Sequence, residues 1–435
     1  MSTNDPKTTA HNDHNVYILG AGFSVDAGLP LIKGFMNRMR DAAAWLGSQA
    51  GRERELEAID RVLRFRLEAT GAAYRVPLDV DNVEELFSLA SASGDEDLAA
   101  KMPLAIAATL DYARTIAKPL AEDRPYDLGV RENSEWARPR NWGRPVRHQP
   151  TDNRNGVPDR WFSCPRHEFY LGLIGGYFNP GGPDRRDTII TFNYDTVIEE
   201  ALAGLGLPFA YGASHLIGRE ALSDVLSAQN AGDRLRVLKL HGSINWVSEL
   251  KEIAQDSIKS GGLPYAGSHF LKSRITAFAS YSELRTGGHV PLLVAPTWNK
   301  VFSGYLAAIW TEAVQALKAA TRVIILGYSM PATDQHFKYL LAAGLQDNIS
   351  LRKIFFVNPA LIDEQKKSLL NERLFSVFRR EHFERGIIEL EPLDIQQFFA
   401  GAAHEPSGRA LIGRTLNPLE QNFNEARWVG LGFWQ

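Results

Sequence analysis

The sequence is nearly free of cysteine. Its 435 residues contain a single one, Cys164, which excludes a disulfide framework within the chain and any zinc site built from several thiolates. His, Asp and Glu are scattered along the chain without the spacing of metal ligands. We therefore expect a protein of the reducing cytoplasm that binds no structural metal.

Long apolar runs and an excess of one charge are also missing. No segment approaches 18 uninterrupted apolar residues and the first fifteen residues are polar, so we expect neither a membrane span nor a secretory signal. The formal net charge of -3 gives no global indication of binding to nucleic acid or to an anionic membrane surface.

Short apolar runs recur along the chain and predict buried strands. Helical patterns lie between them, notably at 197–205, 305–320 and 335–345. This alternation is typical of the α/β class, here a Rossmann-like parallel sheet with helices on both faces. The runs are VYIL, TIITF, RVLKL, VPLLVA, RVIILG and KIFFV.

About 165 residues separate the first two predicted strands, far more than a crossover requires. We expect an insertion over about 31–166, mainly helical up to residue 118. Within it, Asn82 followed by Glu85 has the pattern of a capping box, which explains both residues without a functional role.

Residues 124–166 lack periodicity and are rich in Arg and Trp. From 131 to 166 there are eight Arg against two Glu and two Asp, with Trp136, Trp142 and Trp161 between them. This composition suits direct contact with nucleic acid. A solvated lid or a loop that docks another protein explains it as well and is favoured, because neutral proteins often carry one basic loop.

A bare turn follows the first predicted strand. Gly20, Ala21 and Gly22 lie where a strand passes into a helix, an arrangement in which backbone amides approach a pyrophosphate. The third glycine of the dehydrogenase fingerprint would fall at position 25, where Val25 stands. The turn therefore predicts nucleotide binding but disfavours hydride transfer, and a simple tight turn is the alternative.

Polar residues follow four later strands, at the edge where an open α/β sheet binds its ligand. Each has an ordinary alternative, since Asn and Asp often cap helices and a lone His is often structural. Their joint occurrence favours one site. The residues are Asn193 and Asp195, His241, Gly327 and Ser329, and Asn358.

Taken together, these residues resemble the motifs of a known protein family. The set G-A-G-x-S-x-x-x-G-x-P from Gly20 to Pro30, followed by T-x-N-x-D and L-H-G, is similar to the sirtuin NAD-binding domain. The resemblance implies a catalytic domain over 15–400, between a flexible N-terminus (1–14) and a tail (401–435).

The resemblance also implies residue roles around NAD, which would be the substrate. Ala21, Gly22 and Ser24 would lie around the phosphates, and Ser329 and Asn358 near the adenosine half. Asn193 and Asp195 would flank the nicotinamide ribose, which His241 would face. Gly20 and Gly327 complete the expected cofactor-binding set through their close backbone approach.

Two departures from the sirtuin pattern concern the acceptor. The four cysteines of the family's zinc ribbon are missing, and residues 245–288 form a second insertion in that place. Phe192 and Tyr194 replace a polar and an aliphatic residue of the T-Q-N-x-D motif. The chain is most similar to the prokaryotic sirtuin-like effectors of antiphage defence, which hydrolyse NAD.

The residue types suit that reaction. His241 would accept a proton from the ribose hydroxyl or the attacking water. Asn193 would hold that water or the ribose hydroxyls, and Asp195 would orient the carboxamide or favour the developing cation. Nicotinamide and ADP-ribose would be the products.

Two other functions remain open. One is a sirtuin-type deacylase or ADP-ribosyltransferase, and the other is a sensor that binds NAD or ADP-ribose without turnover. The resemblance further implies control of the NADase, through a homo-oligomer or a partner such as a DNA-translocating ATPase or an Argonaute-like sensor. The aromatic tail, with Trp428, Phe433 and Trp434, is either a docking contact or packed within the chain.

Overall fold

At the centre of the molecule lies a seven-stranded sheet in which all neighbouring strands run parallel. β1 pairs with β10 on one side and with β2 on the other, so the order of strands reverses beside β1, as in a Rossmann-like fold. In spatial order the strands are β12 (Ile388–Glu391), β11 (Lys353–Val357), β10 (Arg322–Leu326), β1 (Asn15–Leu19), β2 (Thr188–Thr191), β5 (Leu235–Lys239) and β3 (Phe209–Tyr211).

The chain is seen here in a computed structural model, which describes part of its length. The described residues are 14–122, 165–175, 187–205, 207, 209–212, 217–218, 235–251, 272–294, 305–330 and 335–400. The Arg- and Trp-rich segment, apart from residues 165–166, and the tail 401–435 lie outside them, and so do residues 1–13. No helix of the described residues is long and apolar enough to cross a membrane.

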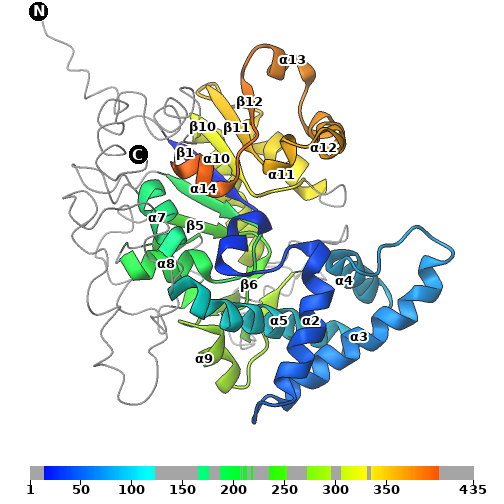
Figure 1. Cartoon of the computed structure of the whole chain (residues 1–435). Helices are drawn as coiled ribbons and strands as arrows, with labels where there is room; N and C mark the ends of the chain where they lie inside the picture. The colour runs from blue at the N-terminus through cyan, green and yellow to red at the C-terminus, as the bar shows by residue number, and fades with distance from the viewer. Residues whose placement is uncertain are drawn as a thin grey trace, which may run out of the picture.

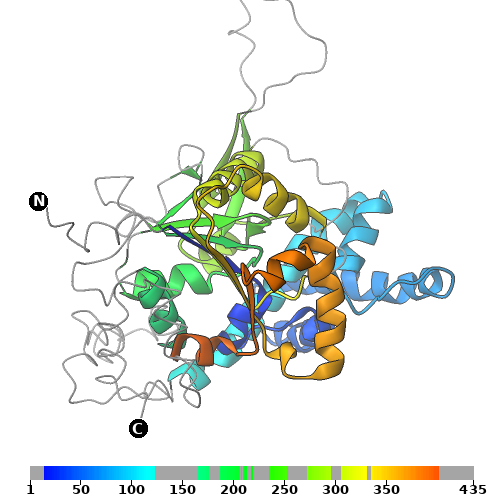
Figure 2. The same ribbon diagram turned by 90° about the horizontal axis from the view of Figure 1, so that it is seen from above.

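Helices cover both faces of the sheet, as the sequence predicts (Figures 1 and 2). The central strands are buried along their whole length because both faces are covered. One face carries α7 (Pro165–Ile174), α8 (Val197–Leu205) and α14 (Ile395–Ala400), and the other carries α10 (Tyr305–Ala319) and α11 (Gln335–Leu345). At the β11–β12 end of the sheet lie η6 (Pro359–Leu361), α12 (Glu364–Val377) and α13 (Arg380–Glu384).

The predicted insertion is helical and has a hydrophobic core of its own. Its helices bury one face each and pack together beneath the carboxyl edge of the sheet (Figure 1). Apolar side chains from Val197 and Leu293 join this second core and attach it to the sheet. The helices are α2 (Ile32–Leu46), α3 (Glu53–Ala73), α4 (Val83–Ala92) and α5 (Glu96–Glu122).

Two smaller sheets are formed mainly by residues that follow His241 in the chain. One joins β4 (Ile217–Gly218), β8 (Lys272–Ala277) and β7 (Trp246–Lys251), and the other joins β6 (Gly242–Ser243) to β9 (Leu292–Leu293). The helix α9 (Tyr281–Thr286) follows β8.

One predicted strand of the large sheet is wrong, and two of its strands were not predicted. The run VPLLVA yields only the two-residue β9, which pairs antiparallel with β6 outside the large sheet. The large sheet instead includes β3 and β12, which the sequence reading missed. Their sequences, FAY and IELE, are short or alternate with charge, because both strands lie at the edges of the sheet.

Candidate functional site

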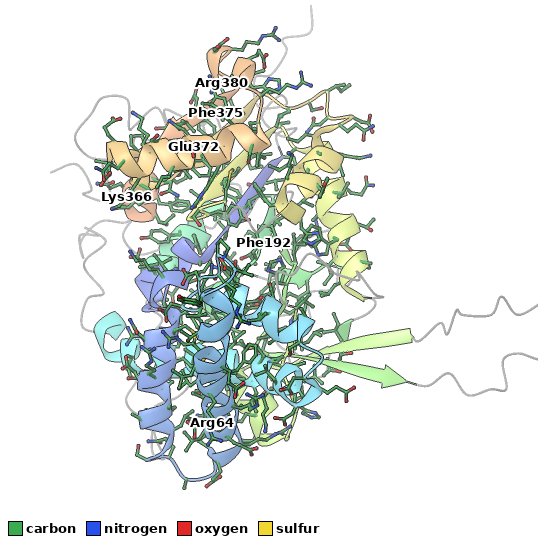
Figure 3. All side chains as sticks on the ribbon, turned by 90° about the vertical axis from the view of Figure 1, so that its right-hand side faces the viewer. Arg64, Phe192, Lys366, Glu372, Phe375 and Arg380 are labelled. Atoms are coloured by element: carbon green, nitrogen blue, oxygen red, sulfur yellow. The ribbon has the colours of Figure 1, made fainter. Side chains whose placement is uncertain are left out.

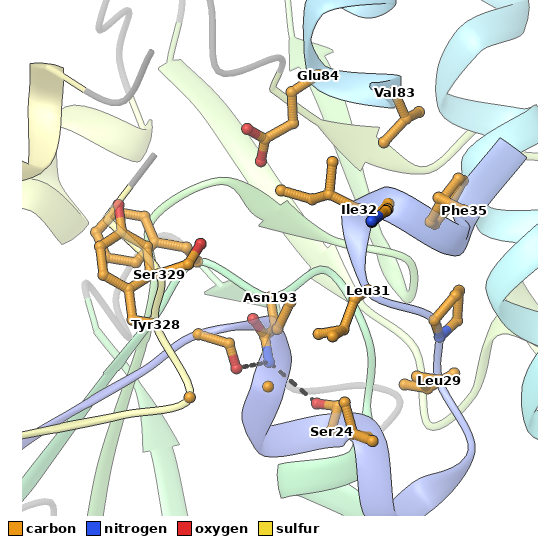
Figure 4. A pocket seen from close by; sticks show the side chains of 18 of the residues that line it. Ser24, Leu29, Leu31, Ile32, Phe35, Val83, Glu84, Asn193, Tyr328 and Ser329 are labelled. Carbon is orange, nitrogen blue, oxygen red and sulfur yellow. Dashed lines mark hydrogen bonds between the residues drawn. The ribbon is translucent and has the colours of Figure 1, made fainter. Parts of the chain in front are cut away.

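A cavity of about 1150 Å³ lies at the carboxyl edge of the sheet, between the strand ends and the helical insertion (Figure 4). The ends of β1, β2, β5, β10 and β11 meet there, as expected for parallel strands. All ten residues that the sequence singles out line it. They are Gly20, Ala21, Gly22, Ser24, Asn193, Asp195, His241, Gly327, Ser329 and Asn358.

The glycines of the first turn pack against the turn after β10. The Gly22 N–H donates to the carbonyl oxygen of Gly327 at 2.8 Å. A Cβ on Gly20 would lie 2.7 Å from that same oxygen, and one on Gly327 would lie 2.3 Å from the Phe23 nitrogen. The glycines of the first turn therefore serve in part to let the backbone of the β10 turn approach it closely. The sequence analysis expected only the approach of a ligand.

Gly28, the later glycine of the motif, has a different role. It ends the short 3-10 helix η1 (Ala21–Ala27) with φ of 83°. A Cβ at this position would lie 2.1 Å from the Cβ of Ala117 on α5. Gly28 thus lets the phosphate-binding turn that we predict lie against the insertion.

Asn193 is held rigidly between two parts of the glycine turn. Its Nδ2 donates to the Gly20 carbonyl at 2.9 Å and to Ser24 Oγ at 3.0 Å (Figure 4). Its backbone N–H donates to Thr191 Oγ1, whose hydroxyl donates in turn to the Leu19 carbonyl. These bonds join the ends of β1 and β2 and fix the orientation of the amide at the cavity.

Asp195 combines a place at the cavity with a structural bond. Its Oδ1 accepts a hydrogen bond from the Val197 N–H at 3.0 Å and so caps α8. The ordinary alternative for this residue, a helix cap, is therefore observed, and its role toward the ligand stays a prediction. Asn358 behaves alike: it accepts from the Ala360 N–H at 2.9 Å and caps η6.

A buried ion pair supports the loop that carries Asn193 and Asp195. Lys239, fully buried at the end of β5, donates from Nζ to the Asp195 carbonyl and lies 2.8 Å from Glu199 Oε1. The Tyr211 hydroxyl donates to the same carboxylate oxygen at 2.9 Å. Burial, and then the charge of Glu199, hold the pKa of Tyr211 well above its ordinary value.

The sequence contained a signal for this ion pair that was not used. A lysine inside the apolar strand RVLKL cannot be buried without a partner, because an isolated buried ammonium is strongly destabilising. Lys239 could therefore have been recognised as part of a buried network, although not its partners.

His241 lies in aromatic surroundings and only 3% of it is exposed. Its ring centroid is 5.1 Å from that of Phe192, edge to face, and 6.1 Å from that of Tyr194. The Tyr194 hydroxyl donates to the Val294 carbonyl at 2.9 Å, while the Val294 N–H donates to the His241 carbonyl at 2.9 Å. The two residues that depart from the sirtuin motif thus form the setting of the histidine.

Figure 3 places Phe192 in the middle of the molecule, between Arg64 of the insertion and Phe375 of α12. It stacks on Tyr328 with ring centroids 5.2 Å apart, which connects the β2 turn to the β10 turn. Near the far end of the cavity, Arg373 donates to the Ser329 carbonyl at 3.2 Å. The Asn358 Nδ2 donates to the neighbouring Tyr328 carbonyl at 3.3 Å.

The insertion forms the opposite wall, and sequence reasoning missed all of its site residues. No strand end marks them, and their apolar members follow the ordinary pattern of amphipathic helices. Those on α4 follow Asn82, whose side chain accepts from the N–H groups of Glu84 and Glu85 as the capping box predicts. Members of this wall are Leu31, Ile32, Phe35, Met36, Val83, Glu84 and Phe87.

Among the described residues, no group of three or more His, Cys, Asp or Glu side chains is arranged to hold a metal ion. The polar groups at the cavity are amides, an imidazole, hydroxyls, carboxylates and the cations of Lys33, Arg40 and Arg373, which suit a polar organic ligand.

Comparison with known proteins identifies one domain. Residues 187–378 match the family model of the SIR2-like domain. The match extends from the start of β2 to just beyond α12, so it includes Asn193, Asp195, His241 and Asn358. The glycine turn and the helical insertion precede it in the chain.

The solved structures that match the chain include sirtuins. One, from a study of the structural basis of sirtuin substrate affinity, is 12% identical, with 92% of this chain and 97% of that chain covered and a TM-score of 0.32. Another, a Sir2 homologue in complex with NAD, is 15% identical, with 87% and 96% covered and a TM-score of 0.29. No curated protein matches the chain.

Proposed function

Because the chain contains a SIR2-like domain, we propose that it hydrolyses NAD to nicotinamide and ADP-ribose. The observation that supports this most strongly is the gathering of all ten residues of the sirtuin-like motifs around one cavity. Six of the ten lie in the matched domain, and the other four lie on the turn after β1, between the neighbouring strands β2 and β10.

The cavity fits a dinucleotide in size and in chemistry. Its volume of about 1150 Å³ exceeds the roughly 300–1,000 Å³ of ordinary small-molecule sites. Ala21, Gly22 and Ser24 would hold the phosphates, and Ser329 and Asn358 the adenosine half. The bonds from Asn193 to the glycine turn support a nicotinamide ribose lying next to the phosphates.

In the proposed reaction the protein positions groups and moves protons. Asn193 orients the ribose hydroxyls or the water, and His241 accepts a proton in the shelter of Phe192 and Tyr194. Asp195 supplies negative charge near the cation that develops as nicotinamide leaves. Each of these residues is positioned by contacts within the protein, which supports a site that stabilises the transition state.

Two features support water, not an acylated peptide, as the acceptor. The chain has one cysteine and so lacks the thiolates of a sirtuin zinc ribbon. The aromatic pair around His241 and the apolar insertion wall further separate this site from the sirtuin motif. By the same resemblance we propose that the protein acts in antiphage defence by depleting NAD, under control of an oligomer or a partner protein.

The test is nicotinamide release from NAD by the purified chain, alone and with the product of a neighbouring gene, with and without an acylated peptide. We expect release without the peptide, and almost none from Asn193→Ala or His241→Ala. Both variants should still bind ADP-ribose by calorimetry. Release that requires the peptide would indicate a deacylase, and full turnover by His241→Ala would contradict the proposed chemistry.

A further inference from the structure

Cationic side chains line the cavity on two of its sides. Lys33 and Arg40 lie on α2, in the insertion. The acidic residues that line the cavity from the same insertion are Asp79, Asp81 and Glu84. Arg373 lies elsewhere, on α12, beside the ends of β10 and β11. This arginine therefore stands apart from the charges of the insertion.

The position of Arg373 is set by the turn after β10. Its Nη1 donates to the Ser329 carbonyl at 3.2 Å. Ser329 lines the cavity on the other side from Ile32 and Val83 of the insertion (Figure 4). Arg373 is exposed and forms no ion pair with the other described residues. Because a guanidinium has five N–H donors, the bond to Ser329 leaves most of them for a ligand.

The strand end beside Arg373 carries an uncharged side chain with both polar atoms engaged. Asn358 accepts from the Ala360 N–H at 2.9 Å and donates to the Tyr328 carbonyl at 3.3 Å. In dinucleotide-binding sheets, a carboxylate that bonds the 2′-hydroxyl of the adenosine ribose suits NAD, whereas an arginine accommodates a 2′-phosphate. The charge at this end of the site must therefore come from other residues than Asn358.

Three carboxylates line the sheet side of the cavity. Asp26 lies in η1, at the glycine turn, and Asp195 follows β2 and caps α8. Asp394 follows β12, the neighbour of β11, and its Oδ1 accepts from the Gln397 N–H at 2.6 Å. None of the three forms an ion pair with Arg373, so the positive charge of this arginine is not neutralised by a described carboxylate.

We infer that Arg373 binds a phosphate group on the adenosine ribose, and that the substrates of the proposed NADase include NADP. This inference rests on the proposed function, in which Ser329 and Asn358 hold the adenosine half of the dinucleotide. Guanidinium and phosphate form a charge-assisted pair that is frequently bidentate, with a geometry that a lysine does not reproduce. Arg373 is thus a residue that determines specificity, at the end of the cavity away from the reacting bond.

Turnover of NADP follows the same chemistry as that of NAD. The bond between ribose C1′ and the nicotinamide nitrogen breaks, and its electron pair leaves with neutral nicotinamide. The water oxygen bonds to C1′, and one water proton passes to His241 and then to solvent. NADP and water give nicotinamide, 2′-phospho-ADP-ribose and one proton, while the 2′-phosphate is unchanged.

Ligand binding tests the role of Arg373 without turnover. Calorimetry on the full chain compares adenosine 2′,5′-bisphosphate with AMP, which lacks the 2′-phosphate. We expect the wild type to bind the bisphosphate more tightly, and Arg373→Met to reduce that preference about tenfold. Arg373→Lys, which keeps the charge, should recover part of it. Arg379→Met is the matched control, because Arg379 is exposed at the start of α13 but does not line the cavity.

The other cavity cations provide a second comparison. Lys33→Met and Arg40→Met should keep the preference for the bisphosphate, since both residues lie on α2. In turnover, Arg373→Met should lower the ratio of kcat/KM for NADP to that for NAD about tenfold.

Three results would overturn the assignment: a wild type without preference for the bisphosphate, a preference that is lost with Lys33 or Arg40, or an equal loss of both ligands in Arg373→Met. The last result would show that Arg373 only holds the turn at Ser329. A wild type that shows the preference but releases no nicotinamide from either dinucleotide would instead contradict the proposed function and leave the binding role of Arg373 supported.

Discussion

The two walls of the cavity are built by different rules. On the sheet wall, the residues at the strand ends are buried and tied by hydrogen bonds that run from one strand end to the next. On the insertion wall, amphipathic helices present apolar side chains over a separate core. The functional groups of the sheet wall are therefore held in position by backbone geometry. Those of the insertion wall depend on the placement of a few helical side chains.

Their electrostatics differ in the same way. Beneath the sheet wall, the Lys239–Glu199 pair is almost wholly buried and directly supports the Asp195 loop. In the insertion, Arg52 bonds Glu55 and Asp111 within the helical core, while other ion pairs such as Lys101–Glu57 are exposed. Change in the sheet wall should therefore cost more stability than equivalent change in the insertion.

The largest effect is expected where the turns after β1 and β10 meet. Gly327→Ala should lower the free energy of unfolding by about 4 kcal/mol or more, because φ is 63° and the new Cβ would lie 2.3 Å from the Phe23 nitrogen. Urea unfolding measures this. Gly288→Ala, with φ of 73° but nothing within 4 Å, is the control for backbone strain alone. Equal losses in the two variants would show that crowding between the turns is unimportant.

A somewhat smaller loss is expected from the ion pair. Lys239→Met should destabilise the protein by about 3 kcal/mol, because it leaves the buried Glu199 carboxylate without its cation. The double variant Lys239→Met/Glu199→Leu should recover most of that loss, since the uncompensated charge is gone. Urea unfolding followed by circular dichroism compares the two variants. If both unfold at the same urea concentration, the pair does not act as a unit.

Alkaline pH should weaken both halves of the molecule through one tyrosine each. Burial raises the pKa of Tyr211 on the sheet side and of Tyr281 on the insertion side. The unfolded chain loses these protons near pH 10, whereas the folded chain keeps them, so the stability present below pH 10 falls as pH rises. The limiting slope is about 1.4 kcal/mol per pH unit for each tyrosine.

Urea midpoints between pH 9 and 11 test this expectation. Tyr211→Phe and Tyr281→Phe should each flatten the loss, whereas Tyr74→Phe, at a position 92% exposed, should leave it unchanged. A loss that persists in the Tyr211→Phe/Tyr281→Phe double variant would have to arise from other groups. A larger change from one variant would show which tyrosine contributes more to the pH dependence of stability.

The smallest expected effect has the opposite sign. Gly34 lies in α2 with open space around the position of a Cβ. Gly34→Ala should stabilise the protein by about 0.5–1 kcal/mol, because alanine loses less conformational entropy in a helix. Thermal unfolding measures the gain. Destabilisation would indicate that the insertion wall is as tightly constrained as the turn at Gly327.

Prediction from sequence succeeded where a periodic signal and a position in the topology agreed. Strand ends in a parallel sheet meet at one edge, so Asn193, His241 and Asn358 could be expected together without knowledge of side-chain contacts. The helical insertion was readable from its length and periodicity. The N-cap predicted at Asn82 is confirmed, because its side chain accepts from the Glu84 and Glu85 N–H groups, whereas Glu85 accepts from the Asn82 side chain and the Asp79 N–H and not from the Asn82 N–H of a full capping box.

The remainder depended on contacts between distant segments. Nothing in the sequence links Gly22 to Gly327, or Lys239 to Glu199, because those pairs form only after strands from separate regions align. Glu84 stood beside Glu85 in the same motif, and only their different positions around the α4 axis separate their surroundings. The edge strand β3 was missed because it is only three residues long, and β12 because glutamates alternate with its apolar residues.

The interlocked turns at Gly22 and Gly327 also limit how this site can evolve. A side chain added to either turn would meet the backbone of the other turn. A single substitution in these two turns therefore cannot make room for a different ligand. The helical wall carries no such reciprocal backbone contact at Leu31 or Ile32. Descendants of this protein that acquire another substrate should therefore differ along α2 and α4, while their glycine turns stay the same.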